Sequence, residues 1–152
     1  MKNILWTVFS GVIALTDLFF KRKSEESAEK EDREILGGRI IVRNVHNHGL
    51  ALNTLDEYPK VVKAVSLTAL AIVALFQCFT SNSKENLLQK AGLTFILGGA
   101  VSNVYDRLKR GYVVDYIAFN IKNKKAKAVT YNLGDFAIFG GTFLLIGNLL
   151  KK

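Results

Sequence analysis

Residues 64–83 read AVSLTALAIVALFQCFTSNS, a stretch of twenty residues without a charge. A helix that crosses the hydrocarbon layer of a membrane needs about 20 mostly apolar residues, because each residue adds roughly 1.5 Å along its axis. Outside this stretch, charged residues concentrate in 21–34, 56–63 and 106–127, and a second uncharged run covers 91–105. This alternation of charged and uncharged segments is typical of a membrane protein.

The composition fits one folded domain. Of the 152 residues, 49% are hydrophobic and only one is proline. Disordered chains are poor in hydrophobic residues, so these numbers argue against disorder along most of the chain. The lone Cys78 can form no disulfide within the chain and therefore says nothing about the redox compartment.

We predict an all-α integral membrane protein, with residues 1–152 forming a single membrane-embedded domain. Its four spanning helices are expected at about residues 3–20, 61–80, 87–105 and 129–150. The first resembles a signal peptide, because Lys2 precedes an apolar run. No A-x-A-like cleavage site follows, and hydrophobicity resumes after Asp17, so we expect this segment to remain as the first span.

The number of crossings decides which helix ends share one side of the membrane. With four spans, the first and third end where the second and fourth begin, so the polar loops 21–60 and 106–128 lie on the same side. The polar residues near these ends are Asp17, Lys21, Asn103, Asp106, Arg107, Asp115, Asn132 and Asp135. Their common side predicts one site, built at one membrane interface.

Asp135 is the most informative of these residues, because the fifteen residues after it carry no charge. A carboxylate at the centre of a spanning helix costs about 2.5–3.5 kcal/mol, so such groups usually face a cavity or a partner. Two alternatives to a functional role are that Asp135 is exposed to water at the membrane interface, or that it caps a helix beginning at residue 136. Asp106 and Arg107 fit either an interfacial ion pair or direct contact with a substrate.

Asp115 and Asp135 form the candidate catalytic pair. Asp115 follows a short extended segment that can return its side chain towards the fourth span. Two carboxyl groups held close together at a partly dehydrated site share one proton, and the resulting division of roles is the basis of aspartic peptidases. His46 and His48 form a competing pattern, a metal site, but a third ligand is missing.

Four sequence blocks, in order along the chain, carry a family resemblance. Residues 98–115 read GGAVSNVYDRLKRGYVVD; the shorter blocks are TDLFFK at 16–21, NHGLA at 47–51 and YNLGD at 131–135. Together they resemble lipoprotein signal peptidase (signal peptidase II), a family of four-span aspartic peptidases of the bacterial cytoplasmic membrane. The block at residues 98–115 matches the family's pattern at every specified position and is highly specific even by itself.

The resemblance implies roles for individual residues. Asp115 and Asp135 correspond to the catalytic aspartates. The residues implied to shape the site and hold the substrate are Asp17, Lys21, Asn47, Gly49, Asn103, Asp106, Arg107 and Asn132. The implied reaction removes the signal peptide of a prolipoprotein by cutting just before a diacylglyceryl-modified cysteine. Prolipoproteins and membrane lipids are the expected partners, with no nucleic acid, no metal and no organic cofactor.

The chain departs from the family's pattern at positions that remove no carboxylate, namely Leu18, Leu50, Leu52 and Gly134. Residues 21–38 are unusually charged for the family's first loop, and we expect a solvated helix or a disordered spacer there. Residues 39–53 read RIIVRNVHNHGLALN, which alternates in polarity and then meets an Asn and Gly turn. This pattern predicts a small extracytoplasmic β-rich cap after the first helix.

Two signals disagree about orientation. The family's active site faces outward, whereas the Lys and Arg residues of the site-side loops favour the cytoplasmic side. We give precedence to the more specific motif match and expect the site at the outer face.

Two other functions stay open. One is a non-catalytic relative that binds lipidated peptides. The other is a membrane protein whose acids bind ions, which needs a polar path across the bilayer; the later spans offer little beyond Ser66 and Gln77 for such a path.

Overall fold

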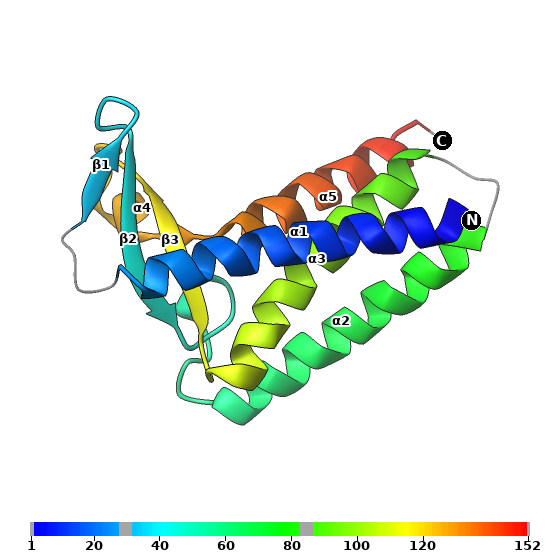
Figure 1. Cartoon of the computed structure of the whole chain (residues 1–152), viewed down its shortest axis with the longest axis horizontal. Helices are drawn as coiled ribbons and strands as arrows, with labels where there is room; N and C mark the ends of the chain where they lie inside the picture. Colours follow the sequence, from blue (N-terminus) through cyan, green and yellow to red (C-terminus); the bar gives the residue numbers. More distant parts are fainter. Residues whose placement is uncertain (1, 28–31, 83–86, 152) are drawn as a thin grey trace.

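The computed structural model describes residues 2–27, 32–82 and 87–151. Within these residues, four long helices pack beside a four-stranded antiparallel sheet (Figure 1). The long helices are α1 (Lys2–Glu25), α2 (Pro59–Asn82), α3 (Leu87–Lys109) and α5 (Leu133–Leu149), and the short ones are η1 (Ala51–Asn53) and α4 (Lys124–Ala128). The strands, hydrogen-bonded in chain order, are β1 (Arg33–Ile35), β2 (Ile40–Asn47), β3 (Val113–Phe119) and β4 (Thr130–Tyr131). A mostly helical protein with a small sheet is thereby confirmed.

Helix α3 is the central helix, because it packs against α1, α2 and α5 (Figure 1). Glycines let α3 and α5 approach until their backbones touch. A Cβ atom added to Gly141 would lie 2.5 Å from the carbonyl oxygen of Gly92, and one added to Gly99 would collide with the backbone of Gly134. Small residues at the contact are a common means of close helix packing in membranes, where burial of apolar surface gives little advantage.

This close approach predicts different effects for two neighbouring substitutions. Gly141→Ala lowers the free energy of unfolding by about 1–3 kcal/mol, because the added methyl group forces α5 away from α3. Gly140→Ala is the matched control, since a Cβ atom there meets nothing within 4 Å. Thermal unfolding in detergent measures both, and equal unfolding temperatures for the two variants would contradict the packing argument.

The sheet joins the two loops that were expected to share one side. Strands β1 and β2 come from the loop after α1, and β3 comes from the loop after α3. Val45 of β2 lies opposite Asp115 of β3, and Asn47 lies opposite Val113. The prediction of a β-rich cap after the first helix is therefore incomplete, because β3 and β4 come from the later loop. Pairing between segments this far apart in the chain leaves no local pattern in the sequence, beyond the apolar character of β3.

The first three predicted spans lie inside longer helices, and the fourth begins too early. Residues 130–131 form β4, and α5 begins only at Leu133 because Asn132 caps it. Among the described residues, α1 and α2 contain segments long and apolar enough to cross a membrane. Helix α5 is apolar but shorter, with 17 residues, whereas α3 carries buried polar residues because other helices surround it. Four crossings therefore stay a prediction.

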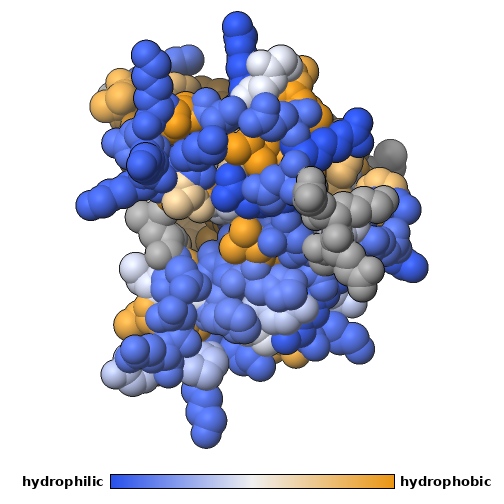
Figure 2. All heavy atoms as spheres, turned by 90° about the vertical axis from the view of Figure 1, so that its left-hand side faces the viewer, coloured by the Kyte–Doolittle hydropathy of each residue, from blue (hydrophilic) through white to orange (hydrophobic). Residues whose placement is uncertain are grey.

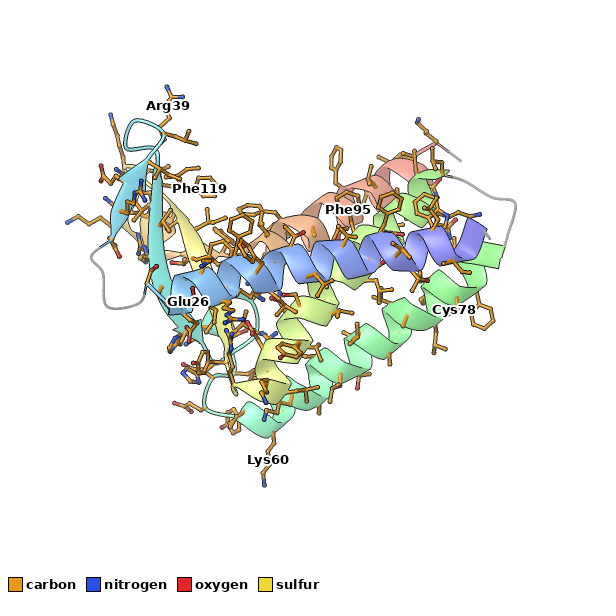
Figure 3. The ribbon with its side chains drawn as sticks, in the orientation of Figure 1. Glu26, Arg39, Lys60, Cys78, Phe95 and Phe119 are labelled. Carbon is orange, nitrogen blue, oxygen red and sulfur yellow. The ribbon has the colours of Figure 1, made fainter. Side chains whose placement is uncertain are left out.

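The polar and apolar surfaces of the molecule are separated. The sheet lies at one end of the helices and both termini lie at the other (Figure 1). The sheet end is largely hydrophilic (Figure 2), and its position relative to Cys78 near the far end of α2 is seen in Figure 3. The helices expose large apolar side chains, with Phe79 and Phe143 at 76% and 75% exposure. This distribution suits helices that are surrounded by lipid and a sheet that meets water.

Candidate active site

A pocket of about 790 Å³ lies where the sheet meets the helices. Its polar lining includes Asn47, Asn103, Arg107, Asp115 and Asp135. Its apolar walls include Val65 and Ala69 of α2, Ala100 and Val104 of α3, and Ile138 and Phe139 of α5. A few convergent polar groups in an apolar pocket are typical of a site that binds and orients a ligand.

Asn132 connects the two aspartates. Its Nδ2 atom donates to Asp115 Oδ1 at 2.6 Å. Its Oδ1 atom accepts from the backbone N–H of Asp135 at 2.9 Å, and its own backbone N–H donates to Asp135 Oδ2 at 3.1 Å. The last two bonds form a capping box at the beginning of α5. One asparagine side chain thus both starts the helix and sets the spacing of the two carboxyl groups.

The alternative that Asp135 caps a helix beginning at residue 136 is wrong, because α5 begins at Leu133 and its N-cap is Asn132. Asp135 is the third residue of the helix, where its carboxyl group completes the capping box and also lines the pocket. Asn132 precedes the helix as its N-cap, so it meets Asp135 through the capping box and not as a neighbour on a helix face.

Two further asparagines hold the remaining carboxyl oxygens. Asn47, at the end of β2, donates from Nδ2 to Asp115 Oδ2 at 3.1 Å. Asn103, in α3, donates from Nδ2 to Asp135 Oδ1 at 2.9 Å. Each carboxyl group is therefore fixed at both oxygens, by donors from different elements of the fold.

The pKa of Asp115 is raised from 3.8 to about 7. Burial of the side chain is the main cause, and the negative charge of Asp135 is the second. The hydrogen bonds from Asn47 and Asn132 and the positive charge of Lys21 act in the opposite direction. Because two nearby carboxyl groups cannot both ionise cheaply, the pair retains one proton close to neutral pH.

A buried ionic cluster centred on Lys21 lies next to the pair. Lys21 Nζ is 2.9 Å from Asp17 Oδ2 and 3.3 Å from Asp106 Oδ2, and none of the three side chains is exposed. Lys21 also donates to Asn103 Oδ1 at 2.7 Å. That bond turns the amide of Asn103 so that its Nδ2 faces Asp135. Lys21 therefore helps to position Asp135 by orienting the amide of Asn103.

The neighbours Asp106 and Arg107 have separate roles. Asp106 pairs with Lys21 and accepts the backbone N–H of Val114 at 3.1 Å, which joins the end of α3 to β3. Arg107 lines the pocket and donates to the carbonyl oxygen of Gly49 at 2.7 Å. Asp106 thus forms buried ion pairs with Lys21 and, at 3.4 Å, with Arg110, rather than an interfacial pair with Arg107. Contact of Arg107 with a substrate stays a prediction.

All the predicted site residues lie in or beside this region. Those that line the pocket are Asn47, Asn103, Arg107, Asp115 and Asp135; those that support it from outside the lining are Asp17, Lys21, Gly49, Asp106 and Asn132. A side chain at Gly49 would collide with the backbone of Asn53, which explains a glycine there. Asp17 and Lys21 are fully buried and do not line the pocket, so their expected part in shaping the site stays a prediction.

Two contributors were missed by the sequence interpretation. Ser102 Oγ donates to Asp17 Oδ2 at 2.6 Å, and the hydroxyl group of Tyr116 donates to Asp17 Oδ1 at 3.0 Å. Ser102 lies four residues before Asp106, on the same side of α3, and this spacing was a usable signal. The sequence signal for Tyr116 was weaker: it is a hydroxyl-bearing residue in the mostly apolar segment 113–119.

The histidines of the competing metal pattern do not gather as a ligand set. His46 lines the pocket, but its Nε2 is 2.7 Å from Glu25 Oε1 and its ring stacks on Tyr112. Within residues 2–27, 32–82 and 87–151, no three His, Cys, Asp or Glu side chains gather as metal ligands would. The described part of the chain therefore lends no support to a metal site at His46 and His48.

The sequence matches known proteins over nearly its whole length. The family model described as signal peptidase (SPase) II matches residues 9–151. A lipoprotein signal peptidase of Caldicellulosiruptor bescii is 30% identical over 149 residues, which cover 98% of this chain and 92% of the relative. One from a Sulfurihydrogenibium species is 33% identical over 150 residues, covering 96% and 91%.

Two solved bacterial membrane enzymes, both determined by the in meso method, have a similar fold. The structure at 1.9 Å resolution gives a TM-score of 0.82 over 97% of this chain and 94% of its own, at 21% identity. The structure at 2.3 Å gives 0.75 over 93% and 87%, at 23% identity. At these identities the likeness concerns the fold alone.

Proposed function

The chain belongs to the signal peptidase II family, which removes signal peptides from prolipoproteins, and we propose that it does so as an aspartic endopeptidase. Asp115 and Asp135 are the catalytic pair in this proposal. One observation carries it: the two carboxyl groups are joined through Asn132 and line the same pocket, whose other walls are apolar. The family assignment does not favour the two alternatives, an ion-binding membrane protein and a non-catalytic relative.

The two carboxyl groups divide the reaction between them. Asp115 holds the shared proton, since its pKa is about 7. Asp135 is the ionised member, because it lies at the N-terminus of α5, where the helix dipole favours negative charge. Asp135 removes a proton from water as the water oxygen bonds to the scissile carbonyl carbon, and Asp115 protonates the carbonyl oxygen.

The resulting tetrahedral diol then collapses. Asp135 gives the proton it has gained to the amide nitrogen, the C–N bond breaks, and one diol hydroxyl returns its proton to Asp115. One water is consumed and both carboxyl groups regain their starting states. Arg107, which lines the pocket, is placed to hold backbone carbonyl groups of the substrate.

The same proposal places the protein in the membrane. The four long helices cross the bacterial cytoplasmic membrane, with the sheet and the pocket at the outer face. The substrate is cut before a diacylglyceryl-modified cysteine, whose acyl chains stay in lipid while the scissile bond reaches the pair. The apolar walls from α2 and α5 and the hydrophilic sheet end (Figure 2) support this arrangement. Lys122, Lys124, Lys125 and Lys127 at the sheet end face lipid headgroups and attract anionic ones.

Incubation of the purified chain with a synthetic diacylated precursor peptide tests the proposal. We expect mass spectrometry to show cleavage directly before the modified cysteine, at the same rate with and without a chelator. The rate should fall as the pH rises through about 7, because Asp115 then loses the proton that it donates. Cleavage at another bond, or a rate abolished by the chelator and restored by a metal ion, would reject the aspartic mechanism.

A further inference from the structure

Tyr116 is a buried tyrosine, 5% exposed, whose hydroxyl group makes two hydrogen bonds. It donates to Asp17 Oδ1 at 3.0 Å and accepts the backbone N–H of Leu133 at 3.2 Å. No motif position or expected site residue includes it. The hydroxyl group links the buried ionic cluster around Lys21 to the first residue of α5.

The direction of these bonds is fixed by chemistry. A hydroxyl group has one proton, and a carboxylate only accepts, so the proton of Tyr116 must point to Asp17. Lys21 and Ser102 hold the other oxygen of Asp17. The hydroxyl oxygen therefore turns a lone pair towards the N–H of Leu133, one of the helix-terminal donors that have no partner within their own helix.

Strand β3 thus holds the beginning of α5 through two successive residues. Asp115 accepts from the side chain of Asn132, and Tyr116 accepts from the backbone of Leu133. Asp135 lies two residues further on, in the same helical turn. Any movement of this turn changes the separation of the two carboxyl groups, because Asp115 stays with the strand while Asp135 moves with the helix.

We propose that Tyr116 is a positioning residue for the peptidase reaction, whose hydroxyl group anchors the first turn of α5 to the Lys21 cluster and so fixes Asp135 relative to Asp115. This inference rests on the proposed function of the aspartate pair. Tyr116 touches neither water nor substrate in this role; it acts through the backbone of Leu133.

The variant Tyr116→Phe removes one oxygen atom and keeps the buried ring. We expect kcat for a diacylated precursor peptide to fall about 10- to 100-fold, because small misplacements of reacting groups have effects of this size. KM should stay within about twofold, since the pocket walls are unchanged. The alkaline limb of the pH profile should move to lower pH, because a displaced Asp135 raises the pKa of Asp115 less. Unfolded molecules contribute no activity, so partial unfolding alone leaves the position of that limb unchanged.

A second variant tests the bond from the other partner. Leu133→Pro removes the N–H that Tyr116 accepts, at the first helical position, where proline is tolerated. Asn132 has φ −125° and ψ 171°, an extended conformation compatible with a following proline. Leu133→Ala, which keeps the N–H, serves as the reference for loss of the leucine side chain. Relative to it, we expect Leu133→Pro to lose kcat as Tyr116→Phe does, and the double variant to be no slower than either.

The inference would be overturned if Tyr116→Phe kept the wild-type kcat and pH profile. It would also be overturned if the kcat of the double variant fell by the product of the two single-variant losses. If Tyr116→Phe merely unfolds the protein, Leu133→Pro still decides the question, because equal rates for Leu133→Pro and Leu133→Ala contradict the anchoring bond. These outcomes are distinct from a failure of the proposed function, which would appear as activity in the asparagine variants of Asp115 or Asp135.

Discussion

Asp115→Asn and Asp135→Asn each lower the rate of precursor cleavage by about a thousandfold or more. When two groups act together in catalysis, the remaining group cannot catalyse the reaction alone. Substitution of one group therefore removes nearly all of the rate enhancement that the pair provides. Asparagine keeps the size of the side chain but can neither accept the proton of water nor donate an acidic one. The measurement is the initial rate of cleavage of a diacylated precursor peptide by the purified variants.

Asp32→Asn is the matched control, because this aspartate is 61% exposed and lies outside the pocket. We expect its rate to equal that of the wild type. Insertion into membranes and the thermal unfolding temperature should be recorded for all three variants, so that lost activity is separated from lost protein. Normal activity in a folded Asp115→Asn or Asp135→Asn variant would refute the assignment of the catalytic pair.

Lys21→Met is expected to give the largest loss of stability, about 3–5 kcal/mol. Removal of one partner from a buried ionic cluster leaves the opposite charges unpaired in a medium that solvates them poorly. Asp17 would lose its ion-pair partner and Asp106 would keep only Arg110, at 3.4 Å, while neither carboxyl group is exposed to water. Lys23→Met changes an exposed lysine of the same helix, 60% exposed, and should have little effect. Thermal or denaturant unfolding in detergent compares the two.

A triple variant separates loss of charge balance from loss of packing. Asp17→Asn and Asp106→Asn, added to Lys21→Met, remove the unpaired charges and keep acceptor oxygens for Tyr116 and Val114. We expect most of the lost stability to return, because replacing a whole buried ionic group by neutral residues is often nearly neutral. If Lys21→Met is as stable as Lys23→Met, the cluster has no part in holding the helices together.

The sequence predicted the site better than it predicted the fold around it. Counting the spans was enough to bring Asp115, Asp135 and Asn103 to one end of the molecule, because parity does not depend on the details of packing. The helices themselves were visible in their apolar runs. Helix α3 was among them, because the uncharged run 91–105 predicted a span there, although its polar residues are buried against other helices.

The remaining features depend on contacts between distant parts of the chain. The pairing of β2 with β3 and the anchoring of Leu133 by Tyr116 connect segments that the sequence does not relate. The beginning of α5 was placed too early because the strand residues 130–131 are as compatible with an apolar helix as with a sheet. Tertiary partners, rather than local preference, decide such boundaries.

The double use of Asn132 has a consequence for inhibitors and for resistance to them. A compound that bridges Asp115 and Asp135 would contact atoms whose spacing depends on the cap of α5. A substitution of Asn132 that weakens binding of such a compound would also remove the N-cap of α5, and the enzyme would lose activity. Drug-resistant forms should therefore arise on the apolar walls, where exposed side chains such as Val65 of α2 lie apart from the cap of α5.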